Sequence, residues 1–200
     1  MEELRSCYNC IYSESLQANG PPKLPVGVRT IPLSQGKFAL IDAADYAQVS
    51  QYSWYARPNY IRMHTSNKSS GFARDDKLDI TWYAMRREGN RTIRMHRQIT
   101  NAKRGQVVDH INHNGLDNRQ CNLRVCSHAE NMRNSRSRSG RTSRYKGVSR
   151  DTQSGKWRAQ IWQSKKTHYL GLFDSEIAAA LAYNVKAREL FGEFAYLNNV

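Results

Sequence analysis

No apolar run in this 200-residue chain approaches the length that spans a lipid bilayer, and no secretory signal pattern opens it. Acidic residues are also scarce, because 17 Asp and Glu stand against 31 Lys and Arg, a formal net charge of +14. Such a basic excess attracts polyanions, and the missing apolar run favours a nucleic acid over a membrane surface as the partner. We therefore expect a soluble protein of the cytoplasm.

Hydrophobic residues make up only 39% of the chain, although 10% of its residues are aromatic. This content supports small cores, so two or three compact units fit better than one large core. The positive charge is uneven, with a net charge of +5 over residues 1–100 and +9 over residues 101–200.

Cysteine is rare, with four in the chain. Cys7 and Cys10 have the CxxC spacing of a zinc or redox motif, whereas Cys121 and Cys126 are spaced differently. The four form one structural zinc site if the N-terminus folds over the second pair. Alternatively, the second pair are buried thiols and the CxxC lies free in a flexible tail. Structural disulfides are not expected in an intracellular chain.

Asp, His and Asn are concentrated in one segment, residues 107–131, with the sequence VVDHINHNGLDNRQCNLRVCSHAEN. Its β-branched start favours a strand, and the Asn, Asp and Gly of residues 112–118 suit a turn. A second short strand is expected at 122–125, after which Ser127 can cap a helix. The predicted order is strand, loop, strand, helix.

These residue types suit phosphodiester hydrolysis, which needs a base to activate water and a cation to neutralise growing charge. His110 can take a proton from water, because the unperturbed pKa of histidine lies nearest neutrality. Asp109 and Asn131 offer oxygen ligands for a hard cation such as Mg²⁺, which needs few protein groups.

The segment resembles the ββα-metal active site of HNH endonucleases, in the D-H…N…N form of phage and intron homing enzymes. The resemblance implies that Asp109 and Asn131 hold Mg²⁺ or another divalent cation such as Mn²⁺, and that His110 is the general base. It also implies that Asn122 fixes the His110 imidazole. His128 lies on the same helix face as Asn131 and is kept as a further metal ligand. The resemblance further implies a phage or prokaryotic setting.

Several alternatives stay open around this motif. Adjacent strand residues point to opposite faces, so Asp109 and His110 need a twist or bulge to act together. Arg97 contacts a phosphate or is a surface arginine beside a packing histidine, just before a short helix expected at 97–102. Single D-H pairs also arise by chance, but the joint motif favours a nuclease. The other function classes are a DNA-binding regulator with a decayed nuclease motif and, less favoured, an RNA-binding protein.

Residues 131–146 include six basic side chains and no acidic one. Such a run is usually a solvated linker, and in a DNA-binding chain it also neutralises phosphates along a groove. The members assigned here to DNA are Arg133, Arg136 and Arg138.

Residues 144–198 predict three short strands and a helix. Turns are expected at 152–155 and 164–166, and the helix is capped near Asp174 or Ser175 and closed by Gly192. The runs RYKGV, WRAQI, YLGLF and AAALAY, closed by GEFAYLN, are similar to an ethylene-response-factor-type (Apetala-two) DNA-binding domain. That resemblance implies a three-stranded sheet that lies in the major groove of double-stranded DNA.

Alternation along residues 157–162 predicts which sheet face meets DNA. On the helix, Ile177, Leu181 and Val185 repeat at intervals of four, which predicts a stripe that packs on the sheet. The predicted DNA-facing side chains are Lys146, Ser149, Arg150, Arg158, Gln160, Trp162 and Tyr169.

The sequence therefore predicts a modular α+β protein with four parts. They are a lead-in (1–27), a strand-rich HNH nuclease domain (28–135), a basic linker (136–143) and a DNA-binding domain (144–200). The expected function is metal-dependent cleavage of double-stranded DNA, with site preference from the C-terminal domain.

Overall fold

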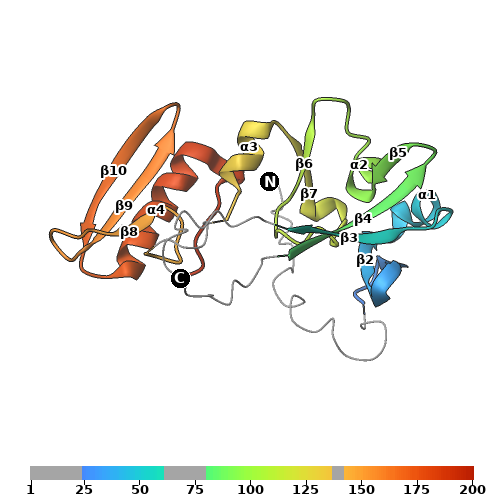
Figure 1. Ribbon diagram of the computed structural model, residues 1–200, viewed down its shortest axis with the longest axis horizontal. Helices are drawn as coiled ribbons and strands as arrows, with labels where there is room; N and C mark the ends of the chain where they lie inside the picture. The colour runs from blue at the N-terminus through green and yellow to red at the C-terminus, as the bar shows by residue number, and fades with distance from the viewer. Residues whose placement is uncertain (1–23, 61–79, 137–141) are drawn as a thin grey trace, which may run out of the picture. The chain divides into compact units, whose positions relative to one another are not determined.

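The computed structural model describes residues 24–60, 80–136 and 142–200 (Figure 1). They form two compact units, the first ending at Val125 and the second beginning at Cys126. Composition predicts that the nuclease domain ends at residue 135. The structure instead groups the helix at His128–Arg133 with the C-terminal unit. The fold is mixed α+β, with several small sheets and few helices.

The first unit is built from a β-hairpin, a three-stranded antiparallel sheet and a two-stranded sheet. The hairpin joins β1 (Val28–Pro32) to β2 (Phe38–Asp42), and the larger sheet has the order β3-β4-β5. Its strands are β3 (Tyr55–Tyr60), β4 (Ile80–Glu88) and β5 (Arg91–Arg94), and the small sheet pairs β6 (Val107–His110) with β7 (Leu123–Cys126). The helices are α1 (Tyr46–Ser50) and α2 (Met95–Ile99), with 3-10 turns at Ser34–Gly36, Ala43–Asp45 and Gln120–Asn122.

The strand-rich character predicted for residues 28–135 is confirmed in this unit. In β2 the inward residues Ala39 and Ile41 have no exposed surface, whereas their neighbours are partly exposed. They pack in a core with Val49, Trp54 and Met95. The helix expected at 97–102 is shifted, because α2 begins at Met95 and so takes His96 into the helix.

The second unit joins a short helix, α3 (His128–Arg133), to an antiparallel sheet of order β10-β9-β8 and a long helix. These elements are β8 (Val148–Arg150), β9 (Trp157–Gln163), β10 (Lys166–Phe173) and α4 (Glu176–Phe191), followed by a 3-10 turn at Gly192–Phe194. Ser175 is the N-cap of α4 and Gly192, with φ +53°, is its C-cap, as predicted.

The predicted packing face of α4 is wrong. Ile177, Leu181 and Val185 are 50%, 49% and 69% exposed. The helix packs on the sheet instead through Ala179, Ala180, Tyr183, Ala187 and Phe191. Small alanine side chains let the helix axis approach the sheet closely, which increases packing contacts. The i, i+4 repeat of larger apolar residues does not predict this kind of packing.

Close packing in this unit requires glycine at position 147. Gly147 has φ +77°, and a Cβ there would collide with the Tyr183 ring and lie 2.6 Å from the Gln160 carbonyl oxygen. We expect Gly147→Ala to lower the free energy of unfolding by about 3 kcal/mol or more, from backbone strain plus overpacking. Chemical denaturation measures this change.

Gly155 is the matched control, since its φ is +66° but the nearest atom to an added Cβ is 3.8 Å away. Gly155→Ala should therefore cost only the backbone strain, about 1 to 2 kcal/mol. Equal losses in the two variants would contradict the packing argument.

Among the residues that the structure describes, no helix is long and apolar enough to cross a membrane.

Candidate active site

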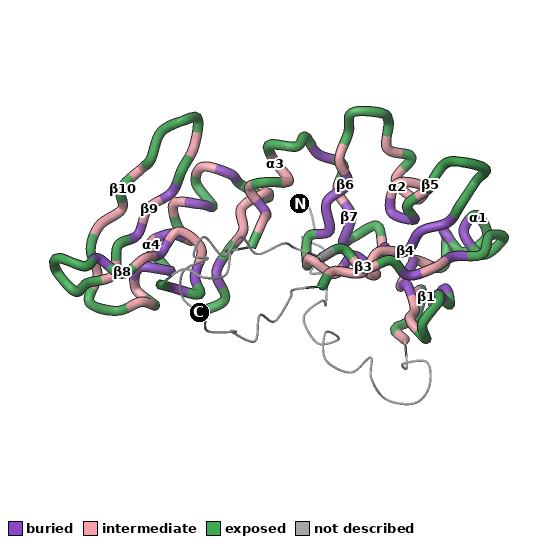
Figure 2. The backbone as a smooth tube through the Cα atoms, in the orientation of Figure 1, coloured by how far each residue is buried: buried purple, intermediate pink, exposed green. Residues whose placement is uncertain are grey.

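The buried histidine His110 ends strand β6, which is buried along most of its length (Figure 2). Its Nε2 lies 3.3 Å from Oδ1 of Asn118, a side chain with no exposed surface. Two rings flank the imidazole, with centroids 5.0 Å away for His96 of α2 and 5.8 Å away for Tyr83 of β4. Three parts of the first unit thus converge on His110.

The His110 imidazole is neutral near pH 7, because burial lowers its pKa. His96 is neutral as well, since burial and the neighbouring His110 lower its pKa to about 3. Asn118 determines the tautomer: its Nδ2 donates to the Leu116 carbonyl at 3.2 Å, so its Oδ1 accepts from His110 Nε2. Nδ1 of His110 then carries the lone pair and is the nitrogen that can take up a proton.

The loop after β6 is anchored on two strands that precede it in the chain. The Leu40 amide of β2 donates to the Leu116 carbonyl at 2.8 Å, and the Asn118 amide donates to the Leu40 carbonyl at 2.7 Å. Gly115 lies against β4, where an added Cβ would be 2.7 Å from the Tyr83 ring. These contacts place Asn118 beside the histidine.

Asn122, which the resemblance assigned to the imidazole, makes different contacts. Its Nδ2 donates to the Asp117 carbonyl at 2.8 Å, and its Oδ1 accepts from the Asn112 amide at 3.0 Å. Asp117 in turn accepts from Arg119 at 2.7 and 2.6 Å and from Asn112 Nδ2 at 2.9 Å. Both ends of the Asn122 amide therefore brace the loop, and a different asparagine lies beside the imidazole.

Asp109 is 7% exposed and is held by Arg124 of the paired strand β7. Its Oδ2 accepts from Arg124 Nη2 at 2.7 Å and from Nε at 3.0 Å. Such charge-assisted contacts fix the orientation of a carboxylate. Because strand side chains alternate, Asp109 and His110 start from opposite faces of β6. The twist predicted between them stays a prediction.

The helix that carries His128 and Asn131 begins as predicted at Ser127. Ser127 Oγ accepts from the Glu130 amide at 3.2 Å, and Glu130 accepts from the Ser127 amide at 2.8 Å, a capping box. His128 is exposed and Asn131 is half-buried. Because α3 belongs to the second unit, their share in a metal site with Asp109 is taken up as a proposal below.

Lys146 lies away from the predicted DNA face. Its Nζ donates to the carbonyls of Arg133 and Ser135 at 2.6 and 2.7 Å, which terminates α3, and burial lowers its pKa to about 8. Arg133 also packs within this unit, because its guanidinium lies 5.2 Å from the Phe191 ring centroid. The structure thus gives Lys146 and Arg133 a packing role where the sequence predicts DNA contact.

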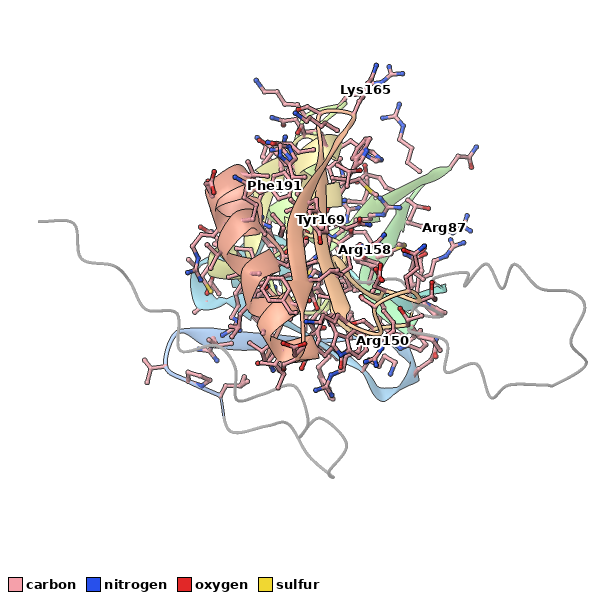
Figure 3. All side chains as sticks on the ribbon, turned by 90° about the vertical axis from the view of Figure 1, so that its left-hand side faces the viewer. Arg87, Arg150, Arg158, Lys165, Tyr169 and Phe191 are labelled. Carbon is pink, nitrogen blue, oxygen red and sulfur yellow. The ribbon has the colours of Figure 1, made fainter. Side chains whose placement is uncertain are left out.

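The face of the C-terminal sheet opposite α4 carries five members of the predicted DNA-binding set. Trp162 and Tyr169 are 65% and 60% exposed, and Gln160 lies opposite Tyr169 in the ladder. Arg158 pairs with Asp151 and lies on the side of the strands away from α4 (Figure 3). We call this surface the outer sheet face; its members are Ser149, Arg158, Gln160, Trp162 and Tyr169.

Arg150 does not belong to the outer sheet face. The register sets it opposite Trp157, and its guanidinium lies 5.0 Å from that ring centroid. Arg136 is exposed, whereas Arg138 lies outside the described residues.

The zinc prediction rests on cysteines in different parts of the chain. Cys7 and Cys10 lie outside the described residues, Cys121 is exposed and Cys126 is buried. Within the described ranges, no group of three or more His, Cys, Asp or Glu side chains is placed to hold a metal. The shared zinc site stays a prediction.

Arg97 supports the backbone before β6. Its guanidinium donates to the carbonyls of Ala102, Lys103 and Gln106 at 3.0, 2.9 and 2.7 Å. The structure therefore favours the packing alternative for Arg97 over a phosphate contact.

Sequence reasoning missed three residues of this site. It treated His96 as a packing residue and assigned no role to Asn118 or Arg124. Asn118 had a detectable signal, because it belongs to the Asn-rich turn of the motif. Arg124 had none, since its partnership with Asp109 depends on strand pairing.

Strand β6 thus carries a carboxylate of fixed orientation, Asp109, followed directly by a buried, neutral histidine, His110. These two groups are suited to hydrolysis. The family model of the HNH endonuclease matches residues 95–133, which run from α2 through α3. Residues 95–133 therefore form an HNH endonuclease domain, and this match supports a nuclease.

The relatives extend this result to other parts of the chain. The chain is 29% identical over 167 residues to an uncharacterized HNH endonuclease of Acanthamoeba polyphaga mimivirus, covering 83% of this chain and 77% of that one. It is 32% identical over 107 residues to protein 3.8 of Escherichia phage T7, covering 51% and 88%. A stretch of 58 residues is 41% identical to APETALA2-like protein 2 of Oryza sativa subsp. indica, covering 29% of this chain and 13% of that protein. No solved structure matches.

Proposed function

We propose that this protein is a metal-dependent, homing-type endonuclease that hydrolyses double-stranded DNA and selects its site with the C-terminal unit. The observation that carries the proposal is His110, which is buried, neutral and held by Asn118 so that Nδ1 bears the lone pair. A similar protein in a phage and another in a giant virus support the assignment to a mobile genetic element.

His110 acts as the general base in this proposal. Its Nδ1 takes a proton from a water molecule, and the resulting hydroxide attacks the phosphorus of the scissile phosphodiester. The P–O bond to the leaving oxygen then breaks, and a solvent water protonates that oxygen. Asn118 keeps the ring in the required tautomer, and the neutral rings of His96 and Tyr83 hold it in place. Asn122 contributes indirectly by bracing the loop that carries Asn118.

The donor types of the proposed ligands suit a divalent cation. Asp109 offers a carboxylate whose orientation Arg124 fixes, and the sequence motif adds an amide oxygen from Asn131 and an imidazole from His128. Oxygen-rich donor sets suit Mg²⁺ or Mn²⁺. When bound, such an ion neutralises charge that develops on the phosphate and stabilises the leaving oxygen.

Site preference is assigned to the outer sheet face of the second unit. The major groove is wide enough to admit strands, and arginine and glutamine can hydrogen-bond guanine and adenine edges. Arg158 and Gln160 provide these groups, while Trp162 and Tyr169 present exposed rings to sugars or thymine methyls. The similarity of this segment to an APETALA2-like protein supports the assignment.

The direct test is cleavage of supercoiled plasmid DNA by the full chain with Mg²⁺ or Mn²⁺ and with chelator. We expect nicked or linear products only with the metal. Intact plasmid under both metals, or cleavage that persists in chelator, would contradict the proposal. Parallel reactions on an RNA duplex should leave the RNA intact.

A second prediction concerns selectivity. Arg158→Ala should weaken binding by about 1–3 kcal/mol at one base pair of the cleaved site and relax the preference there, because a bidentate base contact is lost. Binding to a set of single-base site variants measures the effect.

Lys165 offers a control of like charge. It lies in the turn between β9 and β10 and is exposed, so Lys165→Ala should weaken all site variants alike. If Arg158→Ala also weakens all variants alike, Arg158 is not a base-reading residue.

A further inference from the structure

We propose that one face of the β3-β4-β5 sheet binds the phosphates that flank the scissile bond. Three exposed arginines, Arg57, Arg87 and Arg94, form this surface, which we call the arginine face. The inference deepens the proposed function, because it takes the DNA that His110 cleaves as the ligand.

Strand register places the three arginines on the same face as the candidate active site. In the ladder Arg57 lies opposite Tyr83, and Met85 lies opposite Arg94. Side chains alternate along a strand, so Tyr83, Met85 and Arg87 share one face of β4. Arg57 and Arg94 belong to that face through their partners.

The same face leads directly to His110. The Tyr83 ring contacts the His110 and His96 rings at centroid distances of 5.8 Å. Two residues along a strand span about 7 Å, so Arg94 is one step and Arg87 about two steps from the histidine cluster. DNA that places a phosphate at His110 would therefore run along these guanidinium groups.

The arginine face differs from the opposite face of the sheet, which covers the core. Ala56, Ala84 and Trp82 on that opposite face pack with the core. Glu88 also lies there, and it pairs with the buried Arg86 at 2.8 Å. Strands β3, β4 and β5 thus place their acidic side chain on the face away from His110.

Four other arginines of the first unit are committed to packing. Arg86, Arg97, Arg119 and Arg124 bind carboxylates, an amide oxygen or backbone carbonyls. Arg57, Arg87 and Arg94 instead form no ion pair within the part of the chain that the structure describes. Three exposed guanidinium groups on one face, without such partners, suit phosphate oxygens, which accept bidentate hydrogen bonds from arginine.

The test measures how salt changes DNA affinity. A triple variant, Arg57→Gln with Arg87→Gln and Arg94→Gln, is compared with the parent chain, both carrying His110→Ala to prevent cleavage. Each phosphate contact contributes about 0.9 to the slope of log K against log salt, so losing three should reduce the slope by roughly 2.7. Between 50 and 200 mM salt, the parent should then lose about 40-fold more affinity than the variant.

Arg91 provides the matched control. It is exposed on the same strand as Arg94, but it lies opposite Glu88 and so on the other face. Arg91→Gln should leave the slope nearly unchanged, and replacing the three arginines by lysine should largely preserve it. Thermal unfolding shows that each variant is folded.

Each outcome decides the inference. A triple variant with the same slope as the parent overturns the inference. An Arg91→Gln variant overturns it too if it reduces the slope by as much as each arginine of the triple variant does on average. If the chain with His110 intact fails to cleave plasmid DNA while the binding slopes are as expected, the proposed function is wrong. The arginine face then stands as a DNA-binding surface. If cleavage succeeds and the slopes do not differ, only the arginine face is wrong.

Discussion

His110→Ala should lower the rate of DNA cleavage by about 10²-fold or more at saturating metal, the scale expected when a general base is lost. The imidazole lies at the end of a buried strand with its tautomer determined by Asn118, and its removal takes away the proposed base. DNA affinity should change little, because this group contributes no charge near neutral pH. Single-turnover cleavage and a separate binding assay measure the two effects.

His113 offers a control in the same loop. It has φ +62°, which asparagine tolerates, so His113→Asn removes an imidazole with little backbone strain. We expect this variant to cleave at the rate of the parent. Full activity of His110→Ala in a clean preparation would remove His110 from the mechanism, and equal losses in the two variants would point to damage of the loop.

Asp109→Ala should raise the Mg²⁺ concentration for half-maximal cleavage on the order of 10- to 100-fold, the scale on which metal sites respond to a lost group. The carboxylate is one of few protein oxygens offered to the ion, and removing it also leaves Arg124 without its buried partner. Asn131→Ala should shift the titration in the same direction. Cleavage rates across a Mg²⁺ series measure both changes.

Glu88→Ala serves as the comparison, because it removes an exposed carboxylate of the same unit that lies on the far face of the β3-β4-β5 sheet. Its Mg²⁺ dependence should match that of the parent chain. If Asp109→Ala and Asn131→Ala also match the parent, the ligands lie elsewhere, and His128 is the next candidate. A lost response to metal in all three carboxylate and amide variants would indicate a general loss of folding.

Local features were predictable because they depend on neighbours in the chain. Alternation along residues 157–162 identified β9, and Ser127 and Gly192 marked the ends of helices as capping chemistry requires. The order of Asp, His and Asn in one segment likewise indicated an HNH nuclease.

Helix packing was not predictable in the same way. The apolar repeat of Ile177, Leu181 and Val185 predicts the buried face of α4, but the alanine face is the one that packs. Hydrophobicity ranks side chains by the free energy of their transfer from water. A close contact between a helix and a sheet depends instead on the size of the side chains on both surfaces, as where Gly147 leaves room for the Tyr183 ring.

By itself the sequence determined the strands, the helix ends, the basic balance and the residue types of the nuclease motif, because each is set by composition or by spacing along the chain. Only the tertiary structure decided that Asn118 rather than Asn122 lies beside His110, that Arg124 holds Asp109, and that Lys146 is used in packing. These partnerships join strands and loops that are distant in sequence, such as β2 with the loop after β6. Their energies depend on distance and burial in three dimensions, which no local pattern encodes.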